Sequence, residues 1–149
     1  MLAIGCDHAA VDLKNELLAH LASRQMECFD FGAREGEKVD YPVPACRVAT
    51  AVVEGKCERG VLLCGTGVGI SIAANKVRGI RACCCSEPFS AKLSKQHNDS
   101  NILCMGARVV GTELAKMILD AWLDAEYEGG RHADRVAMLA AMEVGTFRC

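Results

Sequence analysis

The chain has 149 residues, a formal net charge of −2, 51% hydrophobic residues and 24% charged residues. This length is typical of one domain, 1–149, with the composition of a globular protein, and the near-neutral charge does not favour nucleic acid or an anionic membrane as partner. A charge at Asp7 and the lack of a long uncharged apolar stretch argue against a signal peptide and a spanning helix, so we expect a cytoplasmic protein.

Apolar segments and amphipathic segments alternate along the chain. The expected elements in chain order are a strand at 2–6, a helix at 9–24, a strand at 27–31, a helix at 45–54, a strand at 61–64, a helix at 68–76, a strand at 80–85, a helix at 86–98, a strand at 101–105, and helices at 112–124 and 132–142. Thr112 is expected to cap its helix, and Ser86-Glu87-Pro88 is typical of a helix start. The alternation predicts an α/β fold: a three-layer α/β/α, Rossmann-like five-stranded parallel sheet with an extra C-terminal helix.

The segment after the third strand carries glycines at every second position, namely Gly65, Gly67 and Gly69. Glycines let a ligand approach the main chain, and free N–H groups at a helix start favour an anion or a developing oxyanion. Ligands of parallel sheets bind at the carboxyl ends of the strands, where we expect both this turn and Asp7-His8. The segment therefore predicts a cradle for a phosphate or an enolate.

Cys64 lies at the rim of this predicted cradle. A thiol near a helix start ionises more readily, and the thiolate is a usable base or nucleophile, although cysteine is also common at buried strand ends. Thr66 either binds a substrate hydroxyl or caps the helix. The other nine of the ten cysteines show no C-x-x-C spacing, which argues against a metal site. We expect reduced, mostly structural thiols rather than disulfides.

A nucleotide-binding module is an alternative interpretation of the glycine turn. Its G-x-G-x-G spacing is neither that of a dinucleotide fold nor that of a P-loop. Glu87 lies 20 positions beyond Gly67, where a ribose-binding carboxylate belongs in such folds. We favour the simpler interpretation that Glu87 complements the start of its own helix.

Polar residues elsewhere could bind a phosphorylated substrate. His97-Asn98-Asp99 precedes the fifth strand, and imidazole can protonate a ring oxygen near neutral pH. Arg131 and Arg135 share a helical face and could clamp a phosphate, with His132 beside them; pairing with Asp134 or Glu128 on a solvated face is the alternative. Arg108, after the fifth strand, is a further phosphate candidate.

Taken together, these stretches resemble the ribose-5-phosphate isomerase type B family, which includes galactose- and allose-6-phosphate isomerases. The matching motifs, in family order, are Gly5-Cys6-Asp7-His8-Ala9-Ala10, Asp40-Tyr41-Pro42, residues 64–76, Cys85-Ser86-Glu87-Pro88, Gln96-His97-Asn98-Asp99, residues 106–111 and Tyr127-Glu128-Gly129-Gly130-Arg131-His132. Together they are highly specific and cover nearly the whole chain.

The resemblance implies an aldose–ketose isomerase that needs no metal or organic cofactor and acts on an open-chain sugar phosphate through an enediolate. It implies Cys64 as the base, and His97, with or without Thr66, as the group that opens the sugar ring. The implied substrate contacts are Asp7 and Tyr41 to hydroxyls, His8, Arg131 and Arg135 to the phosphate, Arg108 at the rim, and Asn98 with the backbone of Gly65, Thr66, Gly67, Val68 and Gly69 to the enediolate.

The resemblance also implies a partner chain: a homodimer, or a dimer of dimers, with active sites shared between subunits. Part of the family uses a glutamate base where this chain has Ile70, so the chain is similar to the cysteine-type branch. The phosphorylated pentose is the leading substrate, and a six-carbon sugar phosphate is the alternative. A redox or metal reservoir built from the thiols is a third interpretation, disfavoured by the unpaired cysteine spacings.

Overall fold

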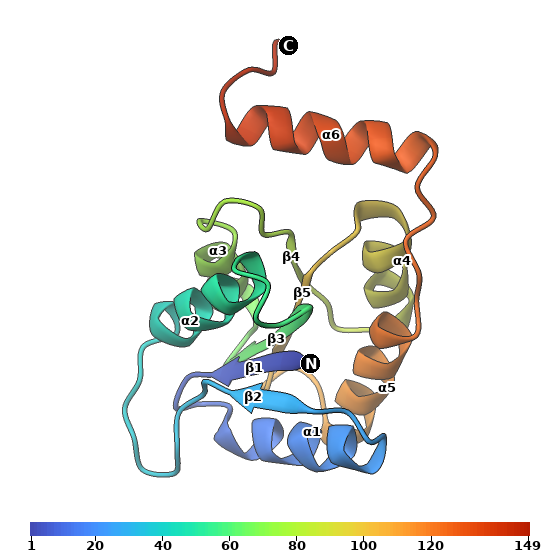
Figure 1. The fold of residues 1–149 in the computed structure, drawn as a ribbon. Coiled ribbons are helices and arrows are strands. Elements are labelled where there is room, and N and C mark those ends of the chain that lie inside the picture. The colour runs from blue at the N-terminus through green and yellow to red at the C-terminus, as the bar shows by residue number, and fades with distance from the viewer.

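A computed structural model describes all residues, 1–149, and contains a five-stranded parallel sheet with helices on both faces (Figure 1). The strands are β1 Leu2–Cys6, β2 Cys28–Asp30, β3 Arg59–Cys64, β4 Ala82–Cys84 and β5 Ile102–Gly106, in the order β2-β1-β3-β5-β4. The helices are α1 Val11–Ser23, α2 Pro42–Val53, α3 Val68–Ala74, α4 Pro88–Asn98, α5 Thr112–Leu123 and α6 Arg131–Glu143. The predicted three-layer, Rossmann-like fold with an extra C-terminal helix is thus confirmed.

Alternate residues of each strand feed two separate cores. Leu63 packs with α1, α4 and α5, in the core that also holds the fully buried Trp122. Its neighbours Leu62 and Cys64 pack with α2 and α3 on the opposite face. This follows from the period of two in a strand, since successive side chains point to opposite faces. The thiol of Cys64 therefore lies on the face covered by α2 and α3.

Several helix boundaries differ from the sequence expectation for local reasons. Helix α2 begins at Pro42, three residues before the expected 45, because proline is well accepted in the first helical turn. The N-cap of α5 is Gly111, without a side-chain cap bond, so the expectation that Thr112 caps this helix was wrong. Helix α4 is capped by Glu87, whose carboxylate accepts hydrogen bonds from the backbone N–H groups of Phe89 and Ser90.

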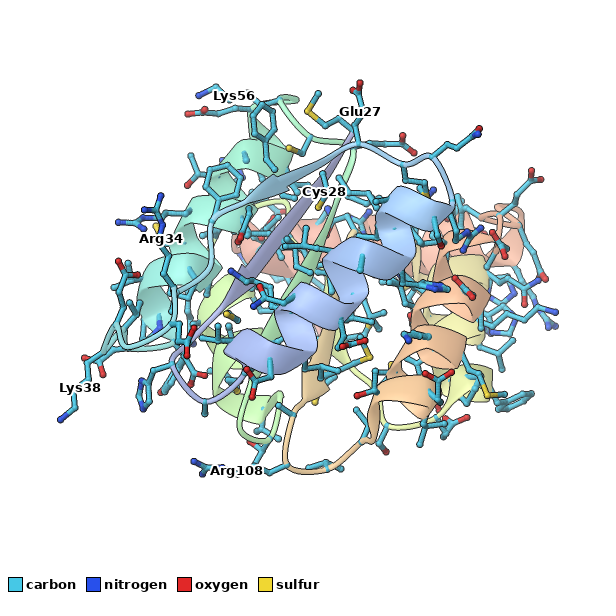
Figure 2. All side chains as sticks on the ribbon, turned by 90° about the horizontal axis from the view of Figure 1, so that it is seen from below. Glu27, Cys28, Arg34, Lys38, Lys56 and Arg108 are labelled. Atoms are coloured by element: carbon cyan, nitrogen blue, oxygen red, sulfur yellow. The ribbon has the colours of Figure 1, made fainter.

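Because the strands are parallel, the sheet has two chemically different edges. We call the edge formed by the ends of β1, β3 and β5 the carboxyl edge, and the edge formed by their starts the amino edge. Gly60 and Cys64, four residues apart on β3, lie about 13 Å apart at the usual rise of a strand. Figure 2 shows Arg108, after β5, at one end of the molecule and Glu27, before β2, at the other.

Helix α6 lies beside the amino edge and apart from the two main helical layers (Figure 1). Its start contacts the end of α4, where the rings of His97 and His132 stack. Near its end, Glu143 accepts a hydrogen bond from the backbone of Gly79, which precedes β4. Met138, Leu139 and Met142 leave about half of their surface exposed on this helix. No helix is both long enough and apolar enough to cross a bilayer.

Candidate active site

Ligands of open parallel sheets bind in a crevice outside the carboxyl ends of the strands, and in this sheet we expect that crevice between β1 and β3. From β1 the sheet continues to β2 on one side and to β3 on the other, which makes this boundary the topological switch point of the sheet. Asp7 and Cys64 occupy the two neighbouring strand ends, and the backbone N–H of Asp7 donates to the carbonyl of Leu63 at 3.2 Å. The strand order thus brings together two residues far apart in sequence.

Cys64 is 4% exposed, and its sulfur accepts a hydrogen bond from the backbone N–H of Gly67 at 3.1 Å. The turn that presents this N–H requires glycine, because Gly67 has φ = 79°. A Cβ atom at position 67 would also lie 2.8 Å from the backbone carbon of Met105 and from the sulfur of Cys84. The chain is therefore shaped to hold a thiol against a backbone donor at this edge.

The segment after β5 holds the glycine turn in place. Ala107 and Arg108 donate backbone hydrogen bonds to the carbonyls of Cys64 and Gly65, at 2.8 and 3.0 Å. The exposed Arg108 side chain passes over Gly65, 3.5 Å from where a Cβ would lie. A cationic guanidinium is thereby placed above the turn, at the rim of the crevice.

One further loop closes around the turn, and the turn itself contributes a hydroxyl. The ring of Tyr41 lies about 3.0 Å from where a Cβ of Gly69 would lie, so glycine at 69 admits the aromatic ring. Thr66 is exposed, and its hydroxyl accepts the N–H of Val68 at 3.3 Å. Thr66 precedes Gly67, the N-cap of α3, and this bond does not prevent its hydroxyl from donating a proton to a ligand.

Asp7 and His8 follow β1 directly. One carboxylate oxygen of the buried Asp7 accepts the N–H of Ala9 at 2.9 Å. The exposed His8 donates from Nδ1 to the carbonyl of Val39 at 2.9 Å, which leaves Nε2 directed elsewhere. Both side chains therefore keep one polar atom available to a ligand at the crevice.

The remaining predicted site residues lie at the amino edge. His97 and Asn98 end α4, and β5 begins at Ile102, directly opposite Gly60 at the start of β3. Arg131 and Arg135 belong to α6; both are exposed, and neither takes part in an ion pair of the chain. Within one chain the structure does not bring these four residues together with Cys64.

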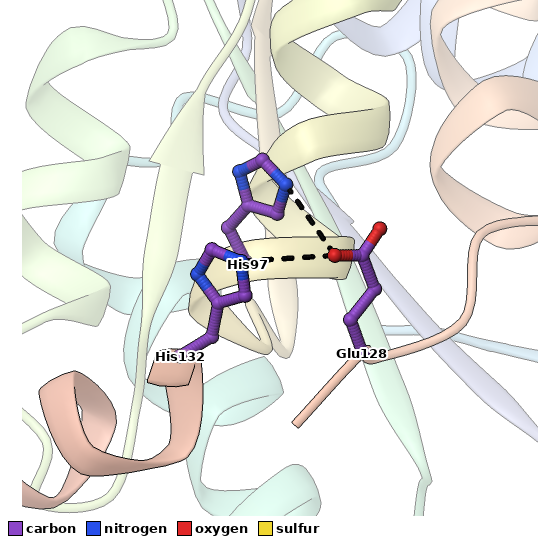
Figure 3. Close-up of side chains that lie close together, drawn as sticks. All are labelled: His97, Glu128 and His132. Carbon is purple, nitrogen blue, oxygen red and sulfur yellow. Dashed lines mark ion pairs between the residues drawn. The ribbon is translucent and has the colours of Figure 1, made fainter. Parts of the chain in front are cut away.

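His97 belongs instead to a cluster with Glu128 and His132 (Figure 3). The two imidazoles stack with centroids 4.2 Å apart and planes 4° from parallel. Their Nε2 atoms lie 3.7 Å (His97) and 3.6 Å (His132) from the same carboxylate oxygen of Glu128. Sequence reasoning treated Glu128 only as a possible arginine partner, because Glu128 lies before α6 and no helical spacing joins it to His132.

Burial lowers the pKa of His132, and the positive charges of His97 and Arg131 lower it further. The neutral imidazole is therefore favoured at this position.

The structure also bears on the remaining thiols and on Glu87. All ten cysteines are free. Burial raises the pKa of Cys6 to about 11 and that of Cys85 to about 12, and it holds the pKa of Cys104 well above the ordinary range, as suits structural thiols. The Glu87 carboxylate is engaged in capping α4, which supports the simpler of its two interpretations.

Comparison with known proteins extends these observations. The sequence profile of the family described as Ribose/Galactose Isomerase matches residues 2–139. Ribose-5-phosphate isomerase B of Escherichia coli is 59% identical over 142 residues, which are 95% of each protein. D-erythrulose-4-phosphate isomerase of Pectobacterium atrosepticum is 46% identical over 143 residues, covering 95% of this chain and 94% of the relative. The solved structure of Clostridium thermocellum ribose-5-phosphate isomerase B has a TM-score of 0.95 at 50% identity, covering 98% of this chain and 99% of that one.

Proposed function

This chain belongs to the ribose/galactose isomerase family, and from that premise we propose that it interconverts ribose 5-phosphate and ribulose 5-phosphate as a cofactor-independent aldose–ketose isomerase. The observation that carries the proposal is the 59% identity to the Escherichia coli enzyme over 95% of both chains. The thiol at the switch point of the sheet suits the chemistry. We place the enzyme in the cytoplasm, where the pentose phosphate pathway operates. We treat residues 1–149 as one domain.

In the proposed reaction, the thiolate of Cys64 removes the proton from C2 of the open-chain aldose and returns it to C1, while the hydroxyl proton passes from O2 to O1 so that the ketone forms at C2. Negative charge develops on the carbonyl oxygen during the transfer, so a base alone would be slow. N–H groups of the turn 65–69 are the nearest donors to the thiol, since one of them already bonds its sulfur. One preorganised donor to such an oxyanion is worth about 3 kcal/mol.

The other predicted residues take roles that suit their chemistry. Asp7 and Tyr41 would bind sugar hydroxyls, and His97, with Thr66, would open the ring by proton transfer. His8, Arg131 and Arg135 would hold the phosphate, with Arg108 at the rim and Asn98 at the enediolate. A phosphate clamp remote from C1 and C2 supplies binding energy for orientation.

We further propose that the active unit is a homodimer, alone or within a dimer of dimers, in which each site combines the carboxyl edge of one chain with the amino edge of its partner. The length of β3 supports this, because its ends are about 13 Å apart and separate Cys64 from His97. The exposed, unpaired Arg131 and Arg135 also support it, since a phosphate bound at the partner's crevice would neutralise them.

The test is turnover of ribose 5-phosphate by the purified protein in the presence of a chelator, beside Cys64→Ala and Cys64→Ser. We expect turnover in the unsubstituted protein and its loss in both variants. Unchanged turnover in the variants would reject Cys64 as the base while keeping the reaction. A chain inactive on ribose 5-phosphate but active on allose or galactose 6-phosphate would establish the six-carbon alternative, since the family's description names galactose beside ribose. Inactivity on every sugar phosphate would overturn the proposal and leave the nucleotide-binding module.

A further inference from the structure

The cluster of His97, Glu128 and His132 combines two imidazoles and one carboxylate outside the crevice that holds Cys64. All three ligand atoms lie within 4.8 Å of one another. Two histidines with one glutamate are a common zinc ligand set, in which the fourth position stays open to water or substrate.

The distances in the cluster are close to those of a tetrahedral site. Ligand atoms at about 2.0–2.1 Å from a zinc ion lie about 3.3–3.5 Å from one another. The carboxylate oxygen of Glu128 is 3.7 Å from Nε2 of His97 and 3.6 Å from Nε2 of His132. Both contacts are longer than a hydrogen bond, so an ion would not have to displace one. The rings are 4° from parallel, so their in-plane lone pairs do not converge in the stack, and binding an ion requires both imidazoles to rotate out of it about the terminal torsion, which is broad for histidine.

The local backbone holds the three side chains in this arrangement. The N–H of Glu128 donates to the carbonyl of Gln96 at 3.0 Å, which fixes the carboxylate beside the neighbouring His97. Gly129 and Gly130, with φ of 63° and 56°, then turn the chain sharply. Helix α6 starts there and carries the buried His132 back over the ring of His97.

The surroundings suit a partly open site. His132 is buried, whereas the side chains of His97 and Glu128 are 34% and 48% exposed, so an ion can enter from solvent. Arg131 and Arg135 oppose a cation there, and the charge of Glu128 counters them.

We propose that His97, Glu128 and His132 form an inhibitory site for a divalent transition metal, with Zn²⁺ as the preferred occupant. This proposal rests on the proposed function. A bound ion occupies the His97 nitrogen that is needed to open the sugar ring, and turnover is thereby inhibited. The bound ion is regulatory and has no part in turnover itself. Mg²⁺, which prefers oxygen ligands in octahedral geometry, does not fit it.

The first arm of the test measures binding alone. The full-length protein, stripped with a chelator and dialysed, is titrated with Zn²⁺, and bound metal is counted by elemental analysis. The variants are Glu128→Gln and His132→Asn, and the matched control is Glu126→Gln, the same change at an exposed side chain two residues away. Metal bound by the free thiols is common to all four proteins and cancels in the comparison.

We expect the unsubstituted protein and Glu126→Gln to bind one more Zn²⁺ per chain than the two site variants. The affinity loss in Glu128→Gln should be at least about 100-fold, because even the outer partners of metal ligands are worth 10–100-fold. Equal binding by Glu128→Gln and Glu126→Gln would overturn the site. Since Glu128 is an exposed surface side chain, this variant keeps the test decisive if His132→Asn fails to fold.

The second arm measures sugar phosphate turnover at increasing Zn²⁺. We expect Zn²⁺ to inhibit the unsubstituted protein and Glu126→Gln, and we expect a chelator to reverse this inhibition. In Glu128→Gln the inhibition should be at least tenfold weaker. Zinc bound at the site without inhibition would overturn the regulatory role. If the metal-free protein shows no turnover, the proposed function fails, while the binding arm still decides the metal site independently.

Discussion

The division of the predicted site between two edges of the sheet can be tested by mixing two inactive variants. Cys64→Ala damages the group of residues at the carboxyl edge, and His97→Asn damages the group at the amino edge. Each variant alone should lose at least about 100-fold in turnover, because general acid–base groups typically contribute 10²–10⁴-fold. If each site combines one group from each chain, a mixed dimer has one site with both lesions and one site with none.

The expected recovery follows from the symmetry of a dimer. When equal amounts of the two variants assort at random, half of the dimers are mixed, and half of the sites in a mixed dimer are intact. Turnover of the unfractionated mixture should therefore return to about a quarter of the value of the unsubstituted protein, and turnover of the isolated mixed dimers to about a half. The variants, carrying two different affinity tags, are unfolded and refolded together, and mixed dimers are isolated through both tags before the assay.

A second mixture serves as the control. Cys64→Ala and Asp7→Asn both damage the carboxyl edge, so every site of their mixed dimer carries a lesion, and no turnover should return. If isolated mixed dimers of Cys64→Ala and His97→Asn also stay inactive, the shared site is refuted. Each chain would then have to bring its own amino edge to its own thiol, which the length of β3 opposes.

Three further predictions concern single positions. Gly106→Ala would place a methyl group 2.5 Å from the backbone of the loop after β3, so kcat/KM should fall about 100-fold. The control Gly111→Ala, whose methyl group meets nothing within 4 Å, should leave steady-state kinetics unchanged. Equal kinetics of the two variants would contradict this packing. Burial raises the pKa of Cys104, so alkylation near pH 8 followed by mass spectrometry should label exposed Cys149 in the folded protein and Cys104 only after unfolding, and early labelling of Cys104 would show an open core. Burial alone would raise the pKa of Asp120, but hydrogen bonds from a histidine and an arginine lower it below 3.8. The free energy of unfolding, measured in denaturant, should therefore fall as the pH drops from 3.8 through the lowered pKa. Asp120→Asn should make this dependence of stability on pH weaker.

The alternation of elements could be predicted from the sequence, because apolar runs and helical periodicity are local signals. Strand order could not, since a right-handed crossover can add the next strand on either side of the sheet. It is this order that puts Asp7 beside Cys64. The start of α2 at Pro42 was not predicted because proline is an ambiguous local signal. It usually interrupts a helix, but it is also favoured in the first helical turn.

The carboxyl-edge half of the candidate site could be predicted because its residues directly follow apolar strands. Residues that precede a strand lie at the other edge, and His97 precedes β5. Their placement at the amino edge was therefore implicit in the order of the chain. The contact between Glu128 and His97 depends on a backbone hydrogen bond to Gln96, and no local pattern predicts such a bond.

The two outermost strands, β2 and β4, are each only three residues long. A longer free strand could pair with another molecule and extend the sheet, but three residues offer too little unpaired backbone for that. Growth by edge-to-edge addition, the usual first step toward fibrils, is therefore discouraged at both ends of the sheet. The proposed dimer would instead use side-chain surfaces such as the exposed apolar residues of α6, and contacts of that kind favour a closed assembly of defined size.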